Sequence, residues 1–251
     1  MQSQLFAYFP PSEYAGRRIL DFGCGNGAST MAIAELLPDT EVVGVELDGR
    51  RISEAHAILE HRGLSNARFL CSPSGEQLPA GIGSFDFVML SAVFEHLLPA
   101  ERRTVMPLLW SHMRPGAVMF VNQTPYRWHP YEHHSTGLWG INLLPDGLAW
   151  QLARRYGART RNRTWTAMLR GGIRGATERS IRRALTADLQ ATEIVQPTQN
   201  GCRDRSDYWL ASTSPRWRPV KRMMAGLFRL TDRLFGTVPT LNVSAAIRKR
   251  R

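Results

Sequence analysis

The chain has 251 residues, 43% of them apolar, so it is long enough to build a buried core. No stretch approaches the roughly 20 uninterrupted apolar residues that a membrane-spanning helix needs. The N-terminus has neither a basic region nor a long apolar run, which argues against a secretory signal, and three scattered cysteines are too few for a disulfide framework. These features predict a cytoplasmic protein.

The charge is distributed unevenly along the chain. Residues 1–150 carry 10 basic and 15 acidic side chains, a net charge of −5, whereas residues 151–251 carry 22 and 6, a net charge of +16. Such a basic half attracts an anionic partner, such as nucleic acid, an anionic lipid or a phosphorylated substrate. A compositional skew without an electrostatic role is the alternative.

Strand-like and helix-like segments alternate over the first 125 residues, which is typical of a parallel sheet with crossover helices. Strands are predicted at 18–22, 41–46, 67–71, 85–90 and 117–122, and helices at 28–37, 49–62 and 101–113. The predicted fold class is α/β, a Rossmann-like doubly wound sheet. Residues 1–125 would form its core, and residues 126–251 would complete the same domain.

The second half of the chain lacks this alternation of strand-like and helix-like segments. Residues 124–144 are rich in Pro, His, Tyr and Trp and predict a structured loop or lid. Helices are predicted at 146–155, 177–189 and 217–235, which makes the basic C-terminal region largely helical, whereas residues 157–175 fit no element. The basic residues 248–251 would strengthen attraction to an anionic surface or form a frayed, solvated tail.

A glycine-rich turn follows the first predicted strand. Gly23, Gly25 and Gly27 are spaced G-x-G-x-G, with Asp21 two residues before the first. Glycine there lets the backbone approach a ligand closely and adopt a positive φ. The dinucleotide fingerprint is G-x-G-x-x-G, so the spacing alone leaves a nucleotide-dependent oxidoreductase open.

The sequence D-F-G-C-G-N-G at 21–27 resembles the first motif of class I S-adenosylmethionine-dependent methyltransferases, and four further segments between 46 and 117 resemble later motifs of that family in order. The resemblance implies S-adenosylmethionine as the cofactor. Its implied contacts are Asp21, Gly23, Gly25 and Gly27 on the methionine side, Glu46 on the ribose, Ser74 and Gly75 at the adenine, and Ser91 after the fourth strand. The family commonly has an acid where Ser74 stands, so adenine contact would come from Ser74, a neighbouring backbone group or Glu76.

Glu95 and His96 follow the fourth predicted strand, at the sheet edge where ligands bind in such folds. In many family members a Glu-His pair here is structural. In a minority it joins a later His to hold a divalent cation, which makes Glu95 and His96 candidate ligands of Mg or Mn. The acid that such relatives often carry three residues before the Glu is Ala92 in this chain.

Residues 124–136 resemble a substrate-side insertion of bacterial methyltransferases encoded among cell-envelope polysaccharide and glycolipid functions. Aromatic faces stack on sugar rings, and His, Glu and Arg side chains bond to hydroxyls. The predicted function is therefore O-methylation of a hydroxyl on a sugar or lipid-linked glycan. His133 or His134 is the expected general base, because an imidazole titrates near neutral pH, with His96 orienting the site; a loop pinned by a satisfied histidine cluster is the alternative.

Residues 217–235 place apolar side chains at helical spacing, with basic side chains mostly on other faces. A basic amphipathic helix of this kind can lie on an anionic membrane surface, which would make the protein peripheral to the inner face of the cell membrane. The alternative is a helix packed against its own domain. An RNA methyltransferase is the second functional hypothesis, although no RNA-binding module is recognisable, and a non-catalytic S-adenosylmethionine-binding adaptor is the third.

Overall fold

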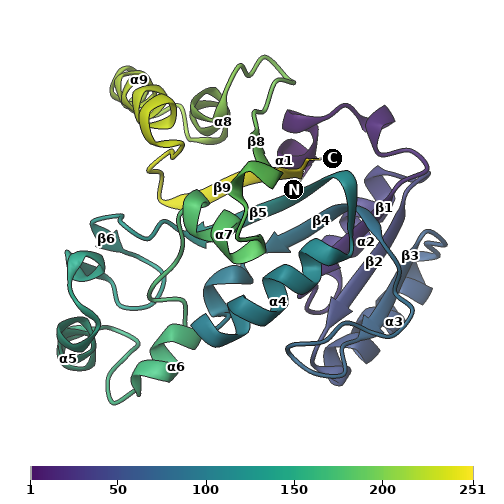
Figure 1. Ribbon diagram of the computed structural model, residues 1–251, viewed down its shortest axis with the longest axis horizontal. Coiled ribbons are helices and arrows are strands. Elements are labelled where there is room, and N and C mark those ends of the chain that lie inside the picture. The colour runs from purple at the N-terminus through teal and green to yellow at the C-terminus, as the bar shows by residue number, and fades with distance from the viewer. Residues whose placement is uncertain (1, 251) are drawn as a thin grey trace.

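The computed structural model describes residues 2–250 and is built on a seven-stranded sheet of order β3-β2-β1-β4-β5-β9-β8 (Figure 1). Its strands are β1 (Arg18–Phe22), β2 (Glu41–Glu46), β3 (Ala67–Cys71), β4 (Phe85–Ser91), β5 (Met113–Pro125), β8 (Thr192–Val195) and β9 (Asn242–Lys249). Strands β1 to β5 pair in parallel, and β9 runs antiparallel to both of its neighbours. The predicted Rossmann-like α/β fold is confirmed, with the strand order reversing between β1 and β4, the point where such folds bind ligands.

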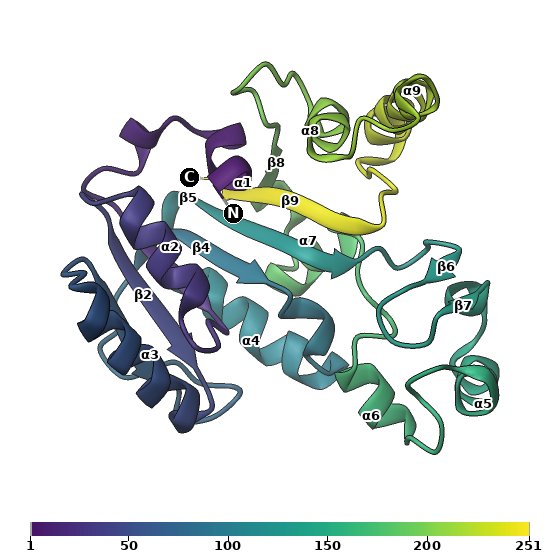
Figure 2. The ribbon, with the colours of Figure 1, turned by 180° about the vertical axis from the view of Figure 1, so that it is seen from behind.

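Helices cover both faces of the sheet (Figure 1, Figure 2). One face carries α1 (Gln2–Tyr8), α2 (Ala28–Leu36) and α3 (Gly49–Arg62), and the other carries α4 (Pro99–Ser111) and α7 (Glu178–Leu185). The remaining helices are α5 (Asp146–Tyr156), α6 (Trp165–Arg170), α8 (Arg205–Ser212) and α9 (Arg218–Phe235), with short 3-10 helices η1 (Pro11–Glu13), η2 (Phe94–His96), η3 (Ile141–Leu143) and η4 (Leu189–Ala191).

Strand side chains alternate between the two helical layers, so each layer has its own core. Val88 of β4 packs in the cluster that contains Met106 of α4, whereas the next residue, Met89, packs in the cluster that contains Ile33 of α2. This two-sided burial is why β4 is apolar at nearly every position.

The end of the chain corrects one prediction. A frayed tail at 248–251 is wrong for Arg248 and Lys249, because both belong to β9, which lies between β5 and β8. Val243 and Ile247 of this strand are buried in the core beside α4 and α7. Arg251 lies outside the described residues.

A cap region, residues 126–176, follows the carboxyl end of β5 (Figure 1). It contains α5, α6 and a separate antiparallel pair, β6 (Tyr131–Glu132) and β7 (Leu138–Trp139). Its small core consists of Ile141, Ala149, Ala153, Met168 and Ile173. Residues 157–175, which fit no element in the sequence, therefore supply α6 and the turns on either side of it.

Within residues 2–250, no helix combines the length and the apolar composition that crossing a membrane requires.

Candidate functional site

The glycine-rich loop joins β1 to α2 and needs its glycines for two physical reasons. Gly23, Gly25 and Gly27 all have positive φ, at 74°, 59° and 80°. Gly27 is also the N-cap residue of α2, and a Cβ atom there would lie 2.4 Å from Cζ of Phe69. The loop can therefore fold against β3 only if position 27 has no side chain.

We expect Gly27→Ala to lower the free energy of unfolding by about 2–4 kcal/mol, because it adds left-handed strain to a steric clash. Denaturant unfolding followed by circular dichroism measures this loss. Gly63→Ala is the matched control, because Gly63 also has positive φ but a Cβ there would meet no atom within 4 Å. Equal losses in the two variants would mean that the clash with Phe69 is relieved without cost.

Asp21 lies behind this loop and is 2% exposed. Its carboxylate accepts hydrogen bonds from Ser29 Oγ at 2.6 Å and from Thr30 Oγ1 at 2.7 Å. Burial raises the pKa of this carboxyl, and the two hydroxyl hydrogen bonds oppose that shift. Asp21 therefore fixes the first turn of α2 to β1, which positions the loop from behind.

Glu46, the last residue of β2, points back to the same loop. Its Oε2 accepts the backbone N–H of Gly25 at 2.9 Å, and its Oε1 accepts the N–H groups of Leu47 and Asp48 at 2.8 and 3.2 Å. Three backbone N–H groups therefore hold the carboxylate in one place, and one lone pair on Oε2 remains free within residues 2–250.

A cavity of about 610 Å³ opens where the carboxyl ends of β1, β2 and β4 meet. Its lining includes five of the residues predicted from sequence, Gly23, Glu46, Ser74, Gly75 and His96, together with Phe22, Leu47, Arg51, Glu76, Ala92 and Arg170. Asp21, Gly25 and Gly27 support the wall from behind, and Ser91 ends β4 in register with Asn122 of β5. Ala92 has a positive φ of 55°, a conformation that non-glycine residues adopt mainly at constrained sites.

Glu95 of η2 lies beside this cavity and is fully buried. Its Oε2 accepts the hydroxyl of Thr124 at 2.9 Å, whereas Oε1 has no hydrogen-bond partner within residues 2–250. The nearest cationic candidate is Nε2 of His96, 3.8 Å from Oε1. A buried carboxylate oxygen without a partner is costly, so this one is suited to a proton donor or a cation.

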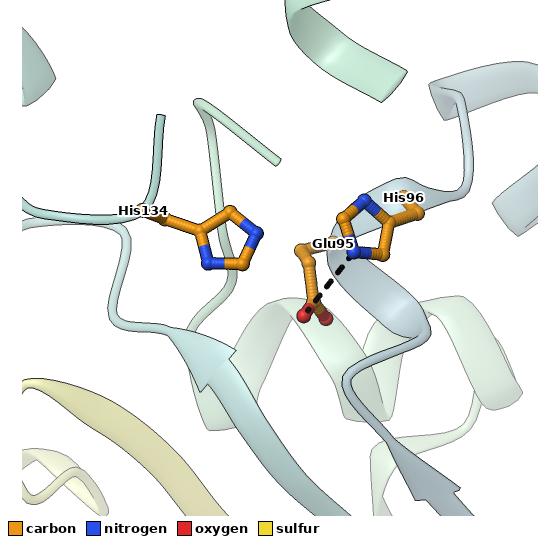
Figure 3. A group of neighbouring side chains, drawn as sticks. All are labelled: Glu95, His96 and His134. Atoms are coloured by element: carbon orange, nitrogen blue, oxygen red, sulfur yellow. Dashed lines mark ion pairs between the residues drawn. The ribbon is translucent and has the colours of Figure 1, made fainter. Parts of the chain in front are cut away.

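His96 and His134 approach Glu95 from two different segments (Figure 3). One ligand atom from each of the three residues can be chosen so that all lie within 4.8 Å of one another, and the two imidazole centroids are 5.4 Å apart. Nδ1 of His96 lies 2.6 Å from the carbonyl oxygen of Arg170, which requires a proton on Nδ1 and leaves the lone pair of neutral His96 on Nε2. That lone pair lies near the free oxygen of Glu95, so a proton or a cation between them would relieve the repulsion.

The two adjacent histidines of the cap region have different surroundings. The ring centroid of His134 lies 5.4 Å from that of His96, whereas the ring centroid of His133 lies 6.2 Å from that of His134, and His133 is near Asn242. Burial lowers the pKa of His133, and the Glu132 charge opposes that shift. Asn242 also lines a second cavity, of about 350 Å³, with Gln123 and Trp209. The structure thus brings His134, and not His133, to Glu95.

Two positions that shape this site were not found from the sequence. Gly172 has a φ of 84°, and a Cβ there would lie 2.6 Å from Cδ2 of His134 and 3.1 Å from Cγ of Glu95. Arg170 holds His96 through its carbonyl group and forms an ion pair with Glu101 of α4. The Gly-Gly pair at 171–172 was the available signal, in a segment that fitted no element.

Residues 19–116 match the family model described as a methyltransferase domain. The trans-aconitate 2-methyltransferase of Deinococcus radiodurans is 32% identical over 130 residues, which are 52% of this chain and 45% of that protein. The ubiquinone biosynthesis O-methyltransferase of Cereibacter sphaeroides is 29% identical over 164 residues, which are 59% of this chain and 62% of that protein. The solved structure "StiE O-MT residues 961-1257" matches over 100% of this chain and 73% of that chain, with a TM-score of 0.52 and 14% identity, which shows the fold alone.

Residues 19–116 are therefore similar to a methyltransferase domain, and this segment contains the glycine loop and most of the residues that line the cavity. The chain spans about half the length of the curated relatives that it matches. The resemblance to cell-envelope members stays a prediction.

Proposed function

We propose that this chain is an S-adenosylmethionine-dependent methyltransferase that methylates a hydroxyl group. One observation carries the proposal: a buried carboxylate with an unpartnered oxygen, Glu95, lies next to the imidazoles of His96 and His134. Of these three residues His96 lines the cavity, to which Glu46 and Gly23 also contribute. The Glu46 carboxylate, which would bind the cofactor ribose, and a group that can accept a proton therefore lie close to the same cavity. The relative named as an O-methyltransferase is consistent with this chemistry.

Methyl transfer to an alcohol needs a proton acceptor. As the acceptor oxygen bonds to the methyl carbon, the carbon–sulfur bond breaks and its electron pair returns to sulfur, which gives a methyl ether, S-adenosylhomocysteine and a proton. We assign that proton to His134, with the Glu95 carboxylate stabilising the resulting imidazolium. His96 is held by the Arg170 carbonyl and acts as a positioning residue.

The acceptor that we propose is a hydroxyl of a sugar or lipid-linked glycan. Aromatic side chains in the cap region support it, because Trp139 is 74% exposed and packs against Tyr131 in a tilted arrangement with ring centroids 5.1 Å apart. Trp128 is also exposed, and the Arg127 guanidinium lies over its ring. Exposed aromatic faces next to hydrogen-bonding side chains suit sugar rings.

The donor set of Glu95, His96 and His134 also fits a divalent cation such as Mg or Mn. The Nδ1–H of His96 donates to the Arg170 carbonyl, which is how metal-binding imidazoles are commonly oriented. A bound cation would polarise the acceptor hydroxyl. Whether transfer needs the cation is decided by assaying with a chelator and then restoring the metal.

The experiment that tests the proposal is transfer of labelled methyl from S-adenosylmethionine into lipid, polysaccharide and RNA fractions of host cells. Label in glycolipid or polysaccharide, in an alkali-stable methyl ether, supports the proposal. Label in RNA would favour the second hypothesis, for which the net charge of +16 over residues 151–251 is the supporting observation. Cofactor binding without transfer to any fraction would favour the adaptor hypothesis.

For the cofactor site, Glu46→Ala should weaken S-adenosylmethionine binding at least tenfold, which is about 1.4 kcal/mol, because the ribose hydroxyls lose their acceptor. Isothermal titration calorimetry measures the affinity. Glu41→Ala is the matched control, because Glu41 begins the same strand and pairs with Arg18 and Arg68 away from the cavity. Unchanged affinity in the Glu46 variant would remove the ribose assignment.

A further inference from the structure

Helix α9 turns an apolar face away from its own domain. Val220, Met223, Leu227, Leu230 and Leu234 recur at intervals of three and four residues, which places them on one face of the helix. Their exposed fractions lie between 45% and 72%. A helix that packs its apolar stripe against its own domain would show the opposite pattern.

The opposite face of α9 holds the helix to α8 largely through charged contacts. Arg229 pairs with Asp204 and Asp207, and Asp232 pairs with the buried Arg205. Phe228 adds one edge-to-face aromatic contact on α8. The polar side of this amphipathic helix therefore faces the protein, and its apolar side faces outward, at the periphery of the molecule (Figure 1, Figure 2).

Positive charge that has no acidic partner in the described part of the chain lies along α9, outside its apolar face, and just before the helix. The basic side chains there are Arg216, Arg218, Lys221, Arg222 and Arg233, and none of them has a carboxylate partner within residues 2–250. Asp232 is the only acidic residue between positions 208 and 241, and Arg205 already neutralises it. The surface around α9 is therefore both apolar and strongly cationic.

A smaller surface of the same character lies on α5. Leu148, Leu152 and Tyr156 recur every four residues and are exposed, and Arg154 and Arg155 occupy the last turn. Both views show α5 and α9 toward the same side of the molecule, away from α3 (Figure 1, Figure 2).

We propose that α9 docks this protein on anionic lipid, with its apolar face in the interface between the acyl chains and the headgroups. Apolar burial and attraction of flanking Lys and Arg to anionic headgroups together give stable binding in the membrane plane. A second copy of the chain would bring two cationic helices together, and nucleic acid would leave the apolar stripe in water. The proposal does not depend on the acceptor or on the methyl-transfer activity.

The test is co-sedimentation of the full chain with two kinds of vesicle, pure phosphatidylcholine and phosphatidylcholine mixed with phosphatidylglycerol. We expect binding to the mixed vesicles to be tighter by about tenfold or more, and to weaken as salt is added. Replacing three side chains of the apolar face in the variant M223Q/L227Q/L234Q should lower binding to the mixed vesicles by about tenfold or more.

Ile58→Gln on α3 is the control for an exposed apolar side chain elsewhere, and it should leave vesicle binding unchanged. Circular dichroism and S-adenosylhomocysteine binding should be the same for the triple variant and the parent protein, because the replaced side chains are exposed. Equal binding of the parent protein to both kinds of vesicle, or no binding, would overturn the proposal. So would a dimer that the triple variant converts to monomer without any vesicle preference, which would make α9 a self-association surface.

Discussion

Replacing Glu95 with Gln is expected to lower the rate of methyl transfer by about 100-fold or more, because a general-base arrangement contributes that much. The change preserves shape and the hydrogen bond from Thr124, but it removes the negative charge that would stabilise an imidazolium at His134. Affinity for S-adenosylhomocysteine should stay close to that of the parent protein, because Glu95 lies beside the cofactor cavity and does not line it. Single-turnover kinetics with saturating cofactor separates the two effects.

The neighbouring histidines provide a matched pair of controls for this result. His134→Gln should lower the rate about as much as the Glu95 change, and the double variant should be little worse than either single one, since the two residues act as a unit. His133→Gln should have a much smaller effect, because His133 is not part of the cluster that Glu95, His96 and His134 form. A larger loss from His133→Gln than from His134→Gln would place the general base at the second cavity. Loss of the parent protein's activity on addition of a chelator would make Glu95, His96 and His134 cation ligands.

The core of the fold was predictable from sequence because its signals are local. Strand β4 shows a nearly continuous apolar run, and each crossover helix shows apolar residues at helical spacing. Strands β1 to β5 were therefore located within a few residues. Strand β9 was missed because its pairing depends on two distant strands, β5 and β8. Its apolar residues are also few and are followed by Arg248 and Lys249, which suggested a solvated end.

Site residues could be predicted where the residue type at one position in a motif was informative by itself. Gly23, Glu46, Ser74 and His96 line the cavity, whereas Gly25 and Gly27 are not lining residues. The choice between His133 and His134 could not be made, because two adjacent residues in an irregular loop can face opposite ways. Gly172 was missed for a related reason, because what it permits is the approach of a loop some 40 positions earlier in the chain.

The orientation of α9 also could not be predicted from the sequence. Its periodicity is the same whether the apolar stripe faces the domain or the solvent. What decides the orientation is a contact network from other elements, in which Arg205 of α8 pairs with both Glu178 of α7 and Asp232 of α9. That network makes the outward apolar face a feature of the folded state.

The last prediction tests the contribution of this ion-pair network to stability. Arg205→Leu should lower the free energy of unfolding by about 3–5 kcal/mol, because it leaves the Glu178 charge buried without its partner. Arg205 and Glu178 are 3% and 1% exposed, and Glu178 also accepts hydrogen bonds from Thr237 and Val238 just before β9. Urea unfolding, with circular dichroism as the readout, measures the loss.

The surface pair of Arg203 with Asp207 is the control for this prediction. Arg203→Ala should change the free energy of unfolding by less than about 1 kcal/mol, because Arg203 is 83% exposed and solvent screens the pair. In the double variant R205L/E178L the buried charges are both removed, so it should be more stable than Arg205→Leu alone. If Arg205→Leu costs no more than Arg203→Ala, the contacts of Phe228 and Ala225 fix α9 instead, and vesicle binding should then survive the loss of Arg205 unchanged.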